Sequence, residues 1–181
     1  MTRAAVGWVV GETKDICSEQ AKVELLDIVS RIVHVGTAIT LVGGTVFTLF
    51  ILLPSAKLLS QDAHDLLASE IKARWKRFVH IGILLFLVSG FYNYFQAIGL
   101  HKGDGLYHGL VGTKILLAFG LFFIAAALVG RSAKLQPMRD KKSFWLKTMV
   151  LIAVVIVAIS GYVKVRGIKP APTGVSVVAR D

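Results

Sequence analysis

Residues 32–53 read IVHVGTAITLVGGTVFTLFILL, and this segment decides the class of fold. It contains no Asp, Glu, Lys or Arg, and Pro54 follows it directly. About 20 predominantly apolar residues are enough for an α-helix to cross the hydrocarbon core of a bilayer. The segment therefore predicts a transmembrane helix that ends at the proline.

The composition of the whole chain agrees with a membrane protein. Of its 181 residues, 55% are hydrophobic and only 18% are charged, and the mean hydropathy is +0.67. Soluble domains carry about 25% charged residues. The chain is thus depleted of the groups that face water, and its length favours a single domain, residues 1–181.

Three more apolar runs follow the first, at about residues 78–98, 107–130 and 144–163. We therefore predict an all-α polytopic membrane protein, built as a bundle of four transmembrane helices. The first helix is expected to begin before the membrane, near Ala21, because an apolar stripe at helical spacing starts there. The Pro-containing segment 170–174 is expected to be an irregular tail.

Basic residues concentrate in the first and third loops. These residues are Lys57, Lys72, Arg74, Lys76 and Arg77 in the first loop, and Arg131, Lys134, Arg139, Lys141 and Lys142 in the third. Cytoplasmic loops are enriched in Lys and Arg. We therefore predict the cytoplasmic (inner) membrane as the location, with both termini outside, although basic residues near the termini (Lys164, Arg166) oppose this orientation.

The net charge of +10 does not predict nucleic-acid binding. The basic residues lie between apolar runs, where they meet anionic lipid headgroups, and no basic segment carries the motifs of a nucleic-acid reader. The single cysteine, Cys17, excludes an intramolecular disulfide and a thiolate metal cluster. The early apolar stretch, residues 4–10, lacks the features of a signal peptide, so the first spanning helix is expected to direct insertion.

Lys114 lies about 10 Å into the third predicted span. An ionisable residue at membrane depth is costly unless it is partnered or faces a cavity. Lys114 either snorkels to the membrane surface or acts as an iron ligand, a partner of a cofactor propionate or a proton-handling group.

Three histidines lie at the ends of predicted spans: His34, His80 and His108. In the predicted topology His34 and His108 are near the outer face and His80 near the inner one, across most of a hydrocarbon core of about 30 Å. His34 and His108 could bind one haem iron if the first and third helices face each other. An isolated interfacial histidine can equally be a simple boundary residue.

Glycines recur in the first and third spans at Gly36, Gly43, Gly44, Gly109, Gly112 and Gly120. Such positions let helix backbones approach closely, or leave room for a flat macrocycle.

Three short motifs carry a family resemblance: His34-Val35-Gly36 with Gly43-Gly44 and Leu52-Leu53-Pro54, the run from Arg77 to Ser89-Gly90, and the run from His108 to Leu117 around Lys114. Over roughly residues 28–165 the chain resembles the copper-resistance D family and its relatives, the four-helix non-flavin protoporphyrinogen oxidases. The oxidase branch implies a haem b site with His34 and Lys114 as key residues, and the copper branch implies metal handling.

The chain departs from the oxidase pattern at two places. It has Val42-Gly43-Gly44 where an aromatic-Gly step is usual, and Pro54-Ser55 where a Pro-Arg pair is usual. These departures argue against porphyrinogen oxidation more strongly than they argue against haem binding.

The leading hypothesis is a haem b-binding redox protein, acting in electron transfer or as a membrane haem oxidoreductase. Its cofactor-binding residues would be His34, His108 and Lys114, with His34 and His108 as iron ligands. The predicted partners are the bilayer and a membrane or periplasmic redox protein, and a homo-oligomer is left open.

Two alternatives remain at this stage. The first is a copper-handling transporter with His34, His80 and His108 as staged ligands. Copper(I) favours soft sulfur ligands, yet Met1, Met138 and Met149 lie at the terminus, in the third loop and early in the fourth span. The second is a non-catalytic membrane scaffold.

Overall fold

The computed structural model describes the backbone of residues 3–167 and the side chains of residues 18–167. Every element in this range is helical, so the predicted all-α class is confirmed. Four long helices dominate: α1 (Arg3–Phe47), α3 (Gln61–Ile98), α4 (Gly105–Val129) and α6 (Lys142–Arg166). The short helices α2 (Leu53–Ala56) and α5 (Gln136–Asp140) lie in the connections. The side chain of Cys17 and the whole segment 170–174 lie outside the described part of the chain.

All four long helices are long and apolar enough to cross a membrane. Only 11% to 17% of the residues in their most apolar windows are buried inside the protein. The remaining apolar surface needs a lipid environment, because so large an exposed hydrophobic area is not stable in water. The chain is therefore an integral membrane protein with a four-helix transmembrane bundle.

Two of the helices extend well beyond the predicted spans. α1 begins at Arg3 rather than near Ala21, and α3 begins at Gln61, so that the charged stretch 72–77 is helical. The first proline of the chain is Pro54, and nothing earlier is incompatible with a helix. The membrane limits the length of the apolar run, whereas the backbone hydrogen bonds of the helix continue past it.

A π-helical segment, Thr48–Leu52, interrupts the first spanning helix, which continues through α2 to Ala56 and so passes the proline at which the sequence predicted its end. The N–H of Leu53 donates to the carbonyl of Thr48, which is the wide spacing of a π-helix. Pro54 follows in the first turn of α2. Proline has no N–H to donate to the preceding turn, and this explains why the regular α-helical bonding breaks here.

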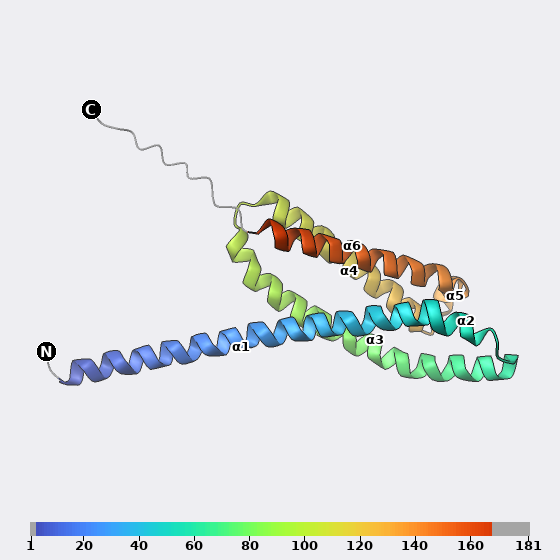
Figure 1. Cartoon of the computed structure of the whole chain (residues 1–181), viewed down its shortest axis with the longest axis horizontal. Helices are drawn as coiled ribbons and strands as arrows, with labels where there is room; N and C mark the ends of the chain where they lie inside the picture. Colours follow the sequence, from blue (N-terminus) through green and yellow to red (C-terminus); the bar gives the residue numbers. More distant parts are fainter. Residues whose placement is uncertain (1–2, 168–181) are drawn as a thin grey trace, which may run out of the picture.

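The bundle consists of two helical hairpins (Figure 1). α1 packs mainly along α3, and α4 packs mainly along α6. We call the end that carries α2 and α5 the basic end, and the end that carries the connection between α3 and α4 (residues 99–104) the far end. A buried core around Leu49, Val79, Ile124 and Met149 joins the hairpins towards the basic end.

An ion pair closes the α4–α6 hairpin at the far end. Arg166 Nη1 and Nη2 donate to the two carboxylate oxygens of Asp104 at 2.7 and 2.9 Å. Each side chain is only 12% exposed. Asp104 also caps α4 by accepting from the backbone N–H of Tyr107, so the start of α4 and the end of α6 are held together.

Of the glycines singled out from the sequence, one lies at a close helix contact. The indole of Trp75 packs directly on Gly44, and a side-chain carbon at that position would overlap it. Gly36, Gly43, Gly109, Gly112 and Gly120 have open space instead. Two further close approaches of α1 to α3 use Gly82 and Gly90, which sequence reasoning did not single out for packing.

Candidate functional site

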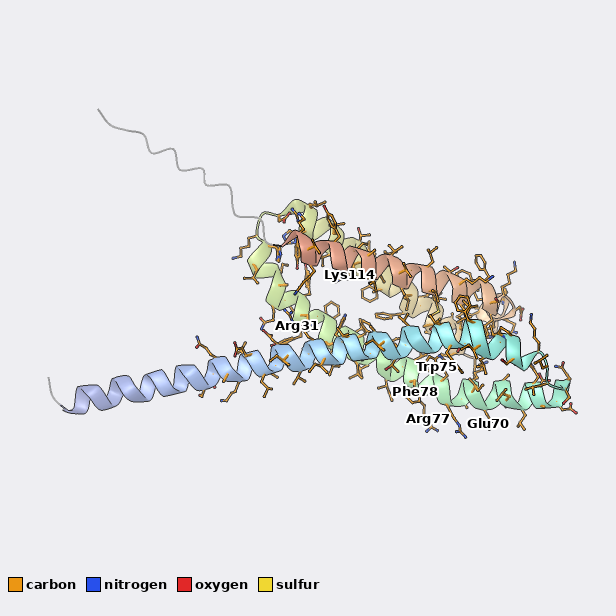
Figure 2. All side chains as sticks on the ribbon, viewed as in Figure 1. Arg31, Glu70, Trp75, Arg77, Phe78 and Lys114 are labelled. Carbon is orange, nitrogen blue, oxygen red and sulfur yellow. The ribbon has the colours of Figure 1, made fainter. Side chains whose placement is uncertain are left out.

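A cavity of about 560 Å³ lies between the two hairpins and is lined by residues of all four long helices. Its walls are mainly apolar, with Phe86, Phe119 and Phe122 among them. Figure 2 shows Lys114 towards the far end of the bundle and Trp75 towards the basic end, and both residues line this cavity. The volume lies within the range of about 300–1,000 Å³ that is usual for ligand sites.

His34 lines the cavity from α1 and is fixed to α3. Its Nδ1 lies 3.0 Å from the hydroxyl oxygen of Ser89, and its ring meets the edge of Phe86 at a centroid distance of 4.4 Å. The absence of a side chain at Gly90 makes room for the ring, since a Cβ there would lie 3.2 Å from His34 Cε1. The imidazole is therefore held on several sides.

The hydrogen bonds of Ser89 define the tautomer of His34. The Ser89 hydroxyl donates its single proton to the carbonyl oxygen of Leu85 at 2.6 Å. Towards His34 the hydroxyl can then only accept, so Nδ1 of the neutral ring carries the proton and Nε2 keeps its lone pair. A hydrogen bond to one ring nitrogen is the usual way in which a protein prepares the other nitrogen to bind a metal.

Ser89 itself is almost fully buried, at 4% exposure. Ser30 on α1 donates to the Ser89 carbonyl at 3.3 Å, which adds a second polar link between the same two helices. Sequence reasoning noted the Ser89-Gly90 step without giving it this role. A serine within an otherwise apolar span was the available signal, because an unpartnered hydroxyl in lipid is unfavourable.

Lys114 lies about 14 Å along α4 from its start at Gly105. Its side chain is partly buried, lines the cavity and acts electrostatically on His34. Two of the three predicted cofactor-binding residues therefore lie in one cavity. A primary amine and an imidazole nitrogen facing a common apolar space can bind a metal centre or an anionic group.

His108, the third predicted cofactor-binding residue, is exposed and does not line the cavity. The spacing between His108 and Lys114 turns the two side chains about 120° apart around a helix of about 3.6 residues per turn. Because Lys114 faces the cavity, His108 faces away from it. The structure does not bring His34 and His108 together.

Neither His80 nor His101 lines this cavity. His80 is exposed, and its Nδ1 bonds to the carbonyl of Lys76 at 2.7 Å. His101 stacks on Tyr107 at a centroid distance of 3.6 Å. Among the described residues, no group of three or more His, Cys, Asp or Glu side chains converges to hold a metal ion.

A second polar cluster links α1 to α3 near the far end. The hydroxyl of Tyr92 donates to Asp27 at 2.9 Å, and the amide of Gln96 donates to the same carboxylate oxygen at 3.3 Å. Tyr92 on α3 and Asp27 on α1 thus fasten the two helices together. The cluster keeps α1 and α3 in the register that His34 and Ser89 need.

Comparison with known proteins gives no match to this chain, whether to a family model, a curated protein or a solved structure.

Proposed function

We propose that this protein binds haem b in the cavity between its hairpins and acts in membrane redox chemistry, as an electron-transfer protein or a haem oxidoreductase. One observation carries the proposal. His34 lines an apolar cavity together with Lys114. Its Nδ1 is hydrogen-bonded to Ser89, and its Nε2 keeps a lone pair. Such a histidine is suited to be an axial ligand of haem iron.

The residues present fit this cofactor. The cavity offers apolar and aromatic walls for a macrocycle, with His34 Nε2 as the iron ligand and Ser89 as the group that orients it. Lys114 either supplies the second ligand as a neutral amine or pairs with a propionate as an ammonium. Bound haem would supply one-electron chemistry, while the apolar walls exclude water and help to set its potential.

The proposed location is the cytoplasmic (inner) membrane, with both termini outside. The basic end of the bundle would then face the cytoplasm, and His34 would lie nearer the outer surface. A membrane or periplasmic redox protein is the proposed electron partner. The copper-transport alternative has no comparable support, because its proposed ligands His34, His80 and His108 do not line a common path: only His34 faces the cavity.

The colour of the purified protein tests the proposal directly. Wild-type protein should be red, with a Soret band and a b-type pyridine haemochrome spectrum. His34→Ala should abolish or greatly reduce haem content, whereas His80→Ala and His108→Ala, which change exposed histidines outside the cavity, should retain it. Full haem occupancy in folded His34→Ala would refute the role of His34, and colourless wild type that cannot take up added haem would refute the function.

A further inference from the structure

The basic end of the cavity has a cationic mouth that the proposed haem site does not use. Lys72 of α3, Arg139 of α5 and Lys142 of α6 all line the cavity. Lys72 and Lys142 are close enough to repel each other electrostatically. Three cations from three different helices therefore converge at one opening of an apolar space.

This mouth is too far from His34 to serve a cofactor bound there. Lys72 lies on the same helix as Ser89, the hydrogen-bond partner of His34, and the two residues are about 25 Å apart along the helix axis at about 1.5 Å per residue. That separation exceeds the reach of a haem propionate from an iron held by His34. An anion bound at the cationic mouth would therefore be a group other than a propionate of this haem.

Arg139 provides a fixed positive charge in the mouth. Its Nε and Nη2 donate to Gln136 Oε1 at 3.1 and 2.7 Å, and Nη2 also donates to the carbonyl of Ser132 at 2.7 Å. Its Nη1 is buried and has no hydrogen-bond partner among the described residues. The hydrogen bonds of Nε and Nη2 hold the guanidinium in place, so Arg139 contributes positive charge to the mouth rather than an open donor.

The nearby carboxylates do not neutralise this group. Asp140 Oδ1 accepts a hydrogen bond from Gln136 Nε2 at 2.8 Å. Glu70 Oε2 lies 3.7 Å from Arg74 Nη2. Neither Asp140 nor Glu70 lines the cavity. The mouth therefore keeps a positive charge that an incoming anion can meet.

Beyond the mouth the cavity wall becomes apolar, with Val79, Ile83, Leu146 and Met149. A small soluble anion would contact the three cations but not the apolar wall, whereas a phospholipid would contact the cations with its headgroup and the wall with its acyl chain. Trp75 lines the same part of the cavity, and tryptophan is favoured at the level of lipid headgroups. We propose that an anionic phospholipid binds here, with its phosphate at Lys72, Arg139 and Lys142 and acyl chain in the cavity.

The proposal predicts lipid selectivity in the purified full-length protein. Delipidated protein in detergent should bind phosphatidylglycerol in preference to phosphatidylcholine of the same acyl chains, as measured by native mass spectrometry and by thermal stabilisation. Inorganic phosphate should not displace the bound lipid at millimolar concentrations. Equal binding of the two lipids, or full displacement by phosphate, would overturn the proposal.

A pair of double variants separates the mouth from general surface charge. Lys72→Gln with Lys142→Gln removes two lining lysines, and Lys76→Gln with Lys141→Gln removes two neighbouring lysines that do not line the cavity. The lining variant should lose about 25-fold in affinity for phosphatidylglycerol, since each lysine near an anionic lipid contributes about fivefold. The control variant should bind like wild type, and equal losses in both variants would overturn the proposal.

The haem content of these variants distinguishes this inference from the proposed function. Because the mouth lies far from His34, the lining variant should keep the haem content of wild type while losing lipid selectivity. Loss of haem together with lipid selectivity, in a variant that remains folded, would show that the two regions form one site and would overturn a separate lipid site.

Discussion

The Nδ1 of His34 and the hydroxyl oxygen of Ser89 lie 3.0 Å apart, and this contact joins α1 to α3 inside an apolar bundle. Because Ser89 gives its own proton to Leu85, the contact also decides which nitrogen of His34 is free. One hydrogen bond thus positions the ring and selects its reactive atom.

Removing the Ser89 hydroxyl should weaken haem binding without removing the proposed ligand. Ser89→Ala frees the His34 ring to rotate and to change tautomer. Loss of such an orienting group typically lowers metal affinity about 10- to 100-fold. Haem retention during dilution, followed at the Soret band, measures the effect. Ser160→Ala is a matched control, because Ser160 also lines the cavity and bonds to its own helix but does not contact His34; equal loss in both variants would argue against a specific role for Ser89.

Adding one methyl group at Gly90 should displace the His34 ring. The new Cβ would lie 3.2 Å from Cε1 of an imidazole that is already held by Ser89 and Phe86. Gly90→Ala should therefore lower haem content or shift the visible spectrum. Gly112→Ala, at a position with open space, should leave the spectrum unchanged and raise or preserve thermal stability, since alanine favours a helix by up to about 1 kcal/mol over glycine. A wild-type spectrum for Gly90→Ala would show that the ring tolerates the shift.

Two substitutions of Lys114 separate its possible roles. If the amine coordinates iron, Lys114→Arg should change the visible spectrum as much as Lys114→Ala does, because a guanidinium stays protonated and has no free lone pair. If the ammonium pairs with a propionate, arginine should preserve the spectrum while alanine weakens haem retention. Identical spectra and haem content in all three proteins would remove Lys114 from the site and leave it as a snorkelling residue.

The proposed orientation can be tested with fusions after Asp181. With both termini outside, alkaline phosphatase fused there should be active and a fluorescent protein should be dark. The reverse pattern would place the cationic mouth on the outer side, together with His34 on the cytoplasmic side. The same fusions placed in the third loop, after Lys134, should give the opposite result, with inactive alkaline phosphatase and a bright fluorescent protein.

The class of fold could be read from the sequence because each span is an uninterrupted apolar run of the length that a bilayer requires. The ends of α1 and α3 could not be placed, because helical hydrogen bonding continues through charged residues outside the membrane. Lys114 was singled out from the sequence because an ionisable residue inside a predicted span is rare. The contact between His34 and Ser89 was not found, because the rotation of α1 against α3 depends on close packing at Gly44 and Gly82, which no single segment reveals.

The position of the cavity on the seam between the hairpins has a consequence for the order of assembly. α1 with α3, and α4 with α6, are each consecutive in the chain and can pair as soon as they enter the bilayer. Neither pair encloses the cavity alone, since its lining includes His34 and Lys114 from different pairs. A ligand that binds there recognises only the finished bundle, and its binding energy stabilises the union of the two halves. If haem binds there as proposed, it would therefore also hold the two hairpins together.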